Sequence, residues 1–260
     1  RKLSLTVLQP ESCGELESAL DGMEWDAGVI AAYGCMVPAS LLARPVFGFV
    51  NLHPSLLPRY RGAAPVERAI MEGASITGVT TIIASERLDA GDILMHAEEP
   101  ILPEDTAGTL EARLSRVGAG LLLETLDALE RGGLVPRTQD EDLATYAPPL
   151  RVEEGEIDWK GNAESIERLV RALNPRPGAY TCFRGRRLKI WEISLTGLPS
   201  EGEPGALTLV GREDFLINTG TDCLRPVSLQ PAGRRRMGAP EFRRGQRLQS
   251  GERFGGSPQG

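Results

Sequence analysis

The polar octapeptide Asn51–Pro58, with the sequence Asn-Leu-His-Pro-Ser-Leu-Leu-Pro, constrains the fold most because it directly follows an apolar run. A second polar set, Asp89–Asp92, begins 36 residues after His53 and follows another apolar run, Val79–Ala84. Short apolar runs bounded by proline or glycine are typical of buried strands. Both polar sets therefore follow predicted strands, and the ends of such strands are where open α/β sheets bind their ligands.

Alternating strands and helices are predicted along the first half of the chain. Leucines that recur at three- and four-residue steps over residues 106–131 predict a long amphipathic helix, which two glycines end. Shorter helices are expected at residues 13–20, 38–43 and 65–72, and strands at residues 3–8, 26–34, 47–52, 79–84 and 93–97. This order implies a mostly parallel sheet with helices on both faces.

The second half of the chain has a different pattern. Prolines and mixed charge over residues 134–155 indicate a linker, and a helix follows at residues 163–173. Short strands are expected at residues 179–183, 188–193, 205–210, 215–218 and 224–229, and a glycine-rich flexible tail at residues 249–260. Five short strands joined by glycine-rich turns favour a small β-barrel over residues 156–248.

Charge divides the chain into an acidic and a basic half. The net charge of −7 combines −11 for residues 1–150, which hold 11 basic and 22 acidic residues, with +4 for residues 151–260. Arginine-rich runs such as residues 184–189 and 234–236 lie in the basic half. The basic half could contact a polyanion, or its charges could form a solvated strand face.

Several classes of protein are not favoured by the composition. No apolar run approaches the roughly 20 residues of a membrane-spanning helix, so no membrane role is expected. The four cysteines are far apart, lack metal-ligand spacing and are expected to be free thiols of a cytoplasmic protein. Only two histidines are present, so no metal site is predicted.

Asn51, His53 and Asp89 are the candidate catalytic residues. Asparagine supplies amide donors, histidine can carry a proton near neutral pH, and aspartate can orient that histidine and hold it charged. This combination suits acyl transfer, in which an oxyanion is stabilised and a proton is moved.

The motifs that contain these residues resemble the folate-dependent formyltransferases. The resemblance rests on Asn51–Pro58, on the extension Arg59–Pro65 and on Leu88–Asp92. The Arg-Gly-Ala-Ala-Pro extension is similar to members that act on methionyl initiator tRNA. The similarity continues through Tyr146–Pro148, Glu156–Trp159, Arg171–Pro175 and Leu229–Gly233.

The resemblance implies a Rossmann-like catalytic domain over residues 1–133 and an oligonucleotide-binding-like barrel that binds tRNA over residues 156–248. Family members have an opening strand, a turn, a helix and a basic loop before the point at which this sequence starts, so the catalytic domain is expected to be N-terminally incomplete. The implied reaction transfers a formyl group from 10-formyltetrahydrofolate to the α-amino group of methionyl initiator tRNA. No metal and no obligate protein partner are expected.

The resemblance also implies roles for individual residues. Asn51 would donate to the formyl oxygen, His53 as imidazolium would stabilise the oxyanion, and Asp89 would pair with His53 and assist proton transfer. From the residues alone, Asp92 could stabilise a turn with Gly91 or take a direct chemical role. The folate would contact Tyr33, Cys35, Met36, Val37, Ala84, Ser85 and Leu88, and the tRNA would contact Arg59, Arg61, Arg186, Arg187 and Lys189.

Two alternative functions stay open at this point. Another folate-dependent formyltransferase or hydrolase would act on a small substrate, although the arginine-containing extension and the basic half argue against it. A truncated, non-catalytic RNA-binding protein would not need the intact set of Asn51, His53 and Asp89.

Overall fold

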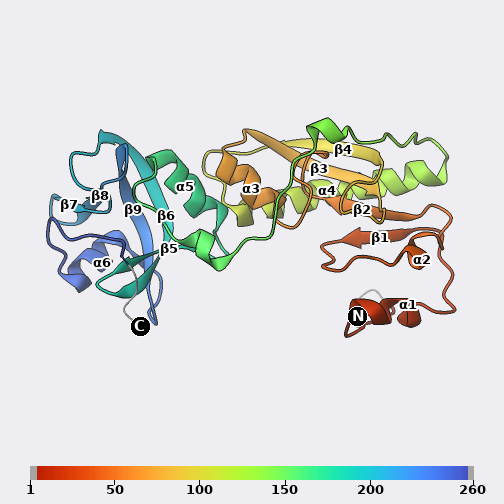
Figure 1. The fold of residues 1–260 in the computed structure, drawn as a ribbon, viewed down its shortest axis with the longest axis horizontal. Helices are drawn as coiled ribbons and strands as arrows, with labels where there is room; N and C mark the ends of the chain where they lie inside the picture. The colour runs from red at the N-terminus through yellow and green to blue at the C-terminus, as the bar shows by residue number, and fades with distance from the viewer. Residues whose placement is uncertain (1–4, 257–260) are drawn as a thin grey trace. The chain divides into compact units, whose positions relative to one another are not determined.

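A computed structural model describes residues 5–256 of the chain (Figure 1). The chain forms two compact units. The first unit comprises residues up to Pro65, 76–100 and 113–147, and the second comprises residues 66–75, 101–112 and 148–260. The functional domain limits proposed above, with a linker at 134–155, stay predictions.

The first unit contains a four-stranded sheet in the order β1 (Gly28–Ala31), β2 (Phe49–His53), β3 (Ile76–Ile83) and β4 (Ile93–Pro100). The predicted α/β character is confirmed, but the expectation of a mostly parallel sheet is wrong for the described strands. Only β1 and β2 pair in parallel, whereas β2–β3 and β3–β4 are antiparallel. The connection from β3 to β4 has fewer than the dozen or so residues that a parallel crossover requires.

Helix α4 (Ala107–Glu130) packs on one face of this sheet (Figure 1). A Cβ atom at Gly118 of this helix would lie 2.9 Å from Leu52 Cδ2, and the hydroxyls of Thr125 and Thr81 are 2.9 Å apart. Leu52 and Thr81 are paired neighbours across β2 and β3. Because side chains alternate along a strand, Asn51 and His53 project from the opposite face of β2.

The remaining elements of the first unit are short. They are a 3-10 turn at Cys13–Glu15, α1 (Leu16–Ala19), α2 (Ala39–Leu42) and a 3-10 turn at Glu141–Leu143. The predicted helix at residues 13–20 is therefore formed as a 3-10 turn that continues directly into a short α-helix. The strand expected at residues 3–8 is not formed over residues 5–8, and residues 3 and 4 lie outside the described part.

The second unit contains an antiparallel sheet and three helices, α3 (Pro65–Glu72), α5 (Ala163–Ala172) and α6 (Ala239–Gln246). The first residue of α3, Pro65, belongs to the first unit. A 3-10 turn occupies Val152–Gly155. The sheet order is β5-β6-β9-β8-β7, with β10 paired to β9. The strands are β5 (Ala179–Phe183), β6 (Arg186–Pro199), β7 (Leu207–Val210), β8 (Asp214–Ile217), β9 (Asp222–Pro231) and β10 (Met237–Gly238). Over residues 5–256 the first and last strands of this order, β5 and β7, do not pair with each other. The sheet is therefore open, and the predicted closed barrel is not observed.

The core of the second unit contains an aromatic cluster. Phe183, Phe215, Phe242 and Phe254 pack with ring centroids 5.3–6.3 Å apart. Phe242 comes from α6, a helix that the sequence pattern missed, and Phe254 comes from the segment expected to be a flexible tail. Phe254 is only 2% exposed, so the chain is packed to at least this residue; residues 257–260 lie outside the described part.

Two expectations from composition are addressed by the structure. Within residues 5–256, none of the helices combines the length and apolarity needed to cross a bilayer. Cys182 and Cys223 are free and buried, but Cys35 is disulfide-bonded. The expectation of four free thiols is therefore wrong for Cys35.

Candidate active site

The structure brings Asn51, His53 and Asp89 together on the sheet face opposite α4. Asn51 Nδ2 donates to Asp89 Oδ1 at 3.1 Å, and His53 Nδ1 lies 3.6 Å from Asp89 Oδ2. The two side chains of the second pair are only 6% and 10% exposed. The three residues meet, but not in the way expected from the sequence, which placed them at neighbouring carboxyl ends of parallel strands. Because β2 and β3 are antiparallel, their carboxyl ends lie at opposite ends of the sheet. The loop formed by residues 84–92 brings Asp89 back to β2.

Both ring nitrogens of His53 face hydrogen-bond acceptors. Nε2 lies 2.9 Å from the carbonyl oxygen of Tyr60, which can only accept, so Nε2 carries a hydrogen. Nδ1 faces the carboxylate of Asp89, a contact that is favourable when Nδ1 also carries a hydrogen. At 3.6 Å this second contact is longer than a normal hydrogen bond. Nδ1 is therefore the nitrogen that can turn toward a substrate oxygen.

The loop that follows His53 is fixed by side-chain hydrogen bonds. Thr80 Oγ1 donates to the carbonyl of Ser55 at 2.7 Å and accepts from the amide of Leu57 at 3.2 Å. Ser55 Oγ donates to the carbonyl of Arg59 at 2.6 Å. These buried contacts leave the loop little freedom and hold the Tyr60 carbonyl against His53.

Gly62 connects this loop to Asp89. Its amide donates to Asp89 Oδ2 at 2.9 Å. Gly62 has a φ of 115°, and a Cβ atom there would lie 2.7 Å from the carbonyl oxygen of Ala147. Only glycine fits this position without displacing the backbone. Asp89 thus accepts hydrogen bonds from two sides, from Asn51 and from Gly62.

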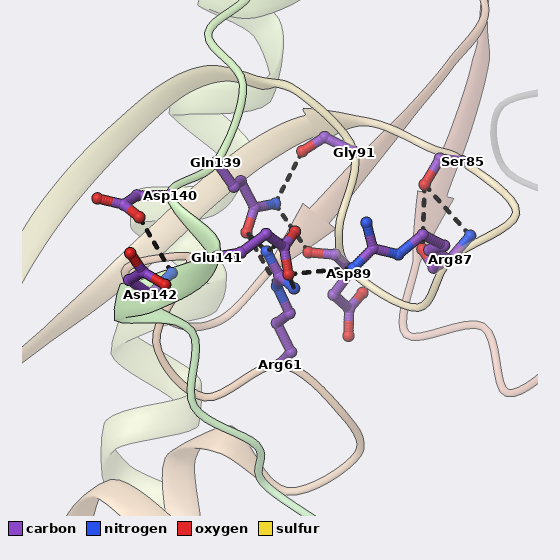
Figure 2. A network of polar contacts seen from close by, with 9 residues as sticks. All are labelled: Arg61, Ser85, Arg87, Asp89, Gly91, Gln139, Asp140, Glu141 and Asp142. Atoms are coloured by element: carbon purple, nitrogen blue, oxygen red, sulfur yellow. Dashed lines mark hydrogen bonds and ion pairs between the residues drawn. The ribbon is translucent and has the colours of Figure 1, made fainter.

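Arg61 does not lie where a tRNA contact was predicted. It is fully buried, and its guanidinium donates to Gln139 Oε1 from Nε and Nη2 at 3.0 and 2.8 Å (Figure 2). Nη1 and Nη2 donate to the two carboxylate oxygens of Glu141 at 3.0 and 3.2 Å. The expectation that Arg61 meets phosphate is therefore wrong, because its donors serve this internal network.

The charges of this network shift each other's pKa values. Burial alone would lower the pKa of Arg61, but the hydrogen bonds and charges of Glu141 and Tyr146 raise it above the usual arginine value. The hydrogen bond from Arg61, with a smaller one from Arg87, lowers the pKa of Glu141. Arg87 Nη2 lies 3.0 Å from Glu141 Oε2, and both side chains are at least half exposed, so this outer pair is weak.

Gln139 is a site residue that the sequence pattern missed. Its Nε2 donates to the carbonyl oxygens of Asp89 and Gly91 at 2.8 and 2.7 Å. It lies in the segment expected to be a linker, and no local signal marks it. That segment pairs with the site through its backbone instead. Arg137 forms an isolated β-bridge with Ile93, and Tyr146 forms one with Arg61.

The predicted folate-contacting residues fall into three groups, which are buried, already engaged in other contacts, or exposed. Val37 is buried with Leu41 and Phe49, and Ala84 packs against this cluster. Ser85 Oγ donates to the carbonyl of Arg87 at 3.1 Å, and Cys35 is disulfide-bonded, so both are already engaged. Apolar surface is exposed at the remaining three residues, Tyr33, Met36 and Leu88.

The other predicted tRNA-contacting residues are spread over both units. Arg59, in the first unit, is exposed, and its guanidinium lies 5.4 Å from the ring centre of Tyr60. In the second unit, the guanidinium of Arg187 lies 3.9 Å from the ring centre of Tyr180. Lys189 Nζ donates to the carbonyl of Pro177 at 2.8 Å and lies 5.2 Å from the ring centre of Trp191. Strand alternation places Arg186 on the face opposite Arg187 and Lys189.

Among the residues that the structure describes, no group of three or more His, Cys, Asp or Glu side chains is arranged to hold a metal ion. The polar groups that contact the carboxylate of Asp89 are the side-chain amide of Asn51, the backbone amide of Gly62 and the imidazole of His53. These groups suit the stabilisation of a developing oxyanion.

Comparisons with known proteins extend over almost the whole chain. Residues 8–126 match the family profile described as "Formyl transferase", and residues 149–247 match "Formyl transferase, C-terminal domain". Methionyl-tRNA formyltransferase of Moorella thermoacetica is 46% identical over 227 residues, which cover 87% of this chain and 73% of the relative. The enzyme of the same name from Bacillus licheniformis is 42% identical, covering 96% of this chain and 80% of its own.

Solved structures share the fold at lower sequence identity. Aquifex aeolicus HypX in complex with tetrahydrofolic acid superposes with a TM-score of 0.66 at 22% identity, over 84% of this chain and 38% of HypX. Methionyl-tRNA formyltransferase from Clostridium thermocellum superposes with a TM-score of 0.55 at 21% identity, over 66% of this chain and 73% of its own. An N-formyltransferase from Helicobacter canadensis, in complex with folinic acid and dTDP-3-aminofucose, gives a TM-score of 0.57 at 21% identity, over 70% of this chain and 65% of its own.

Proposed function

Because this chain belongs to the methionyl-tRNA formyltransferase family, we propose that it transfers a formyl group from 10-formyltetrahydrofolate to the α-amino group of methionyl initiator tRNA. The observation that supports this proposal most is the convergence of Asn51 and His53 on Asp89. An amide donor, an imidazole and a carboxylate lie within one small region, which is the set that acyl transfer requires.

The proposed reaction begins when the substrate amine attacks the formyl carbon and the carbonyl electron pair moves to the oxygen. Asn51 Nδ2 and His53 Nδ1 would donate to that oxyanion. The bond between the formyl carbon and the folate nitrogen then breaks. The proton lost by the amine reaches that nitrogen with the help of Asp89. No covalent enzyme intermediate is formed, because the substrate amine is itself the nucleophile.

The proposed formyl donor is supported by the fold and by an exposed apolar surface. HypX and the Helicobacter canadensis enzyme, which share this fold, bind a tetrahydrofolate compound. Tyr33, Met36 and Leu88 expose apolar side chains to which a flat pterin ring could bind. Of the seven residues assigned to the folate, we keep these three as direct contacts and treat Val37 and Ala84 as part of the buried cluster around Leu41 and Phe49.

The proposed acceptor is supported by the names of the curated relatives and by the basic second half of the chain. Arg187 and Lys189 share one face of β6, where each lies over an aromatic ring. Cations beside aromatic rings can bind phosphate and stack against bases. An acceptor of this kind would place the protein in the cytoplasm. Arg186, on the other face, is a weaker candidate for the same contact.

The proposal is tested with the protein expressed from its full gene and a labelled 10-formyl donor. Methionyl initiator tRNA, methionyl elongator tRNA and a nucleotide-linked amino sugar would be offered as acceptors. We expect label in the initiator tRNA. Transfer to the amino sugar alone would identify a formyltransferase for small substrates. Binding of tRNA without transfer to any acceptor would identify a non-catalytic RNA-binding protein.

A further inference from the structure

We propose that Gln139 is a positioning residue of the formyl-transfer site, which holds the backbone of Asp89 in place and is itself oriented by Arg61. The inference rests on the proposed function, because it concerns the carboxylate to which that function assigns proton transfer. Gln139 hydrogen-bonds the main chain of residues 89 and 91 and not the carboxylate of Asp89. Its effect would pass through the main chain of the loop that carries Asp89 (Figure 2).

Gln139 uses its full hydrogen-bonding capacity in one arrangement. Its two Nε2 hydrogens are directed to the carbonyls of Asp89 and Gly91 at 2.8 and 2.7 Å. Its Oε1 accepts from Nε and Nη2 of Arg61 at 3.0 and 2.8 Å. An amide has two donor hydrogens and two acceptor lone pairs, so no capacity remains. The residue is only 5% exposed, and water cannot easily replace any of these partners.

Arg61 decides which way the amide of Gln139 points. A guanidinium only donates, so the oxygen of Gln139 must face Arg61 and the nitrogen must face the two carbonyls. The backbone of Arg61 is held by two hydrogen bonds, because its amide donates to the carbonyl of Thr145 at 2.9 Å and its carbonyl accepts from the amide of Ala147 at 2.7 Å. Glu141 holds the outer side of the guanidinium. The orientation of Gln139 is therefore determined by groups of the neighbouring loops.

The conformation of Asp89 needs such support. Asp89 has a φ of 49°, in the left-handed region that residues with a Cβ atom adopt only at an energetic cost. Strained residues of this kind persist where the surroundings fix them. Gln139 bonds the carbonyl of Asp89 and that of Gly91, on either side of Ala90. The carboxylate is then aimed at Asn51 and at the amide of Gly62.

Two substitutions of Gln139 separate the contribution of its Nε2 hydrogens from that of its side-chain volume. Gln139→Glu keeps the shape and the contact with Arg61, but its carboxylate has no hydrogen for the two carbonyls. Gln139→Met keeps the volume and removes every polar contact. Asp140→Asn is the matched control, since this exposed neighbour only caps the following 3-10 turn through the amide of Asp142 at 3.0 Å.

Formyl transfer is measured first, as kcat and KM for donor and acceptor separately. We expect both Gln139 variants to lose about 10- to 100-fold in kcat, the effect of removing a group that orients a catalytic residue. KM should stay near the wild-type value for both substrates, and Asp140→Asn should behave as wild type. A kcat within twofold of wild type in Gln139→Glu would overturn the proposal, because its donors would then be dispensable.

Hydrogen exchange followed by mass spectrometry supplies a readout that does not depend on activity. We expect faster exchange in the peptide covering residues 84–92 and unchanged exchange in the peptide covering β2. Unchanged exchange over residues 84–92, or general unfolding of both variants, would overturn the proposal. If the wild-type protein lacked formyl transfer while the exchange difference remained, the proposed function would fail and the structural role of Gln139 would stand.

Discussion

Replacing Gly62 by alanine tests whether the loop beside Asp89 depends on glycine for steric reasons. Gly62 has a φ of 115°, and its added Cβ would lie 2.7 Å from the backbone carbonyl oxygen of Ala147. Left-handed backbone strain costs about 1–2 kcal/mol, and forced overpacking costs about 1–3 kcal/mol more. We therefore expect Gly62→Ala to lower the free energy of unfolding by about 2–5 kcal/mol.

Two other glycines separate the two causes. Gly132 has a φ of 66° with nothing within 4 Å of an added Cβ, so Gly132→Ala should show the backbone strain alone, about 1–2 kcal/mol. Gly120 lies inside α4 with no neighbour within 4 Å, and Gly120→Ala should stabilise the protein by about 0.5–1 kcal/mol.

The assay is urea unfolding of the three variants and the wild type under identical conditions, analysed by linear extrapolation. The expected order of stability is Gly120→Ala, wild type, Gly132→Ala and Gly62→Ala. Formyl transfer should also fall in Gly62→Ala, because the amide that donates to Asp89 is displaced. A Gly62→Ala protein no less stable than Gly132→Ala would refute the steric argument.

Two further predictions concern the second unit. The hydrogen bond from Arg68 lowers the pKa of Glu154 from 4.5 to about 2, so this carboxylate stabilises the fold above pH 4.5 and loses its effect as the pH falls toward 2. Glu154→Gln should therefore be less stable than wild type in urea at pH 6, with the difference disappearing near pH 2; an equal difference at both values would contradict this. Substituting Arg187 and Lys189 together should weaken tRNA binding and reduce the slope of log affinity against log salt concentration by about 2, whereas Arg186→Gln alone should change this slope by less than 1. If binding titrations gave the double variant the same slope as the wild type, the two cations would belong to a solvated surface.

Local sequence signals predicted individual elements well. The limits of α3 and β5 agree with the expected residues 65–72 and 179–183. Proline begins α3 and Gly73 ends it, so its boundaries are encoded within a few residues. The long helix α4 also follows its leucine period to within one residue at each end. Helix α6 was missed because its single buried aromatic residue, Phe242, lies among arginines and glycine.

Strand direction could not be predicted in the same way. The apolar pattern of β3 is compatible with either direction, and the direction depends on the length and path of the connections. The polar sets at Asn51–Pro58 and Asp89–Asp92 were correctly expected to lie near each other. Their meeting depends on a loop that folds back, which no periodicity in the sequence encodes.

The network behind the site was also beyond sequence reasoning. Arg61 looked like a loop arginine available for phosphate, and Gln139 looked like part of a polar linker. Their pairing joins residues 78 positions apart. Only the fold shows that Arg61 is buried and that Gln139 fills the space between it and the loop of Asp89. Family motifs identified the side chains at the centre, but they did not identify the groups that hold them.

The central claim, that Asn51, His53 and Asp89 act together on the formyl group, is tested most directly by single-turnover formyl transfer in the full-length protein. The rate of the wild type would be compared with those of His53→Ala and of His96→Gln, the exposed histidine on β4. We predict a loss of about 10²- to 10³-fold for His53→Ala, the effect of removing one oxyanion donor, and a rate near wild type for His96→Gln. A folded His53→Ala protein that transfers the formyl group at the wild-type rate would contradict the account.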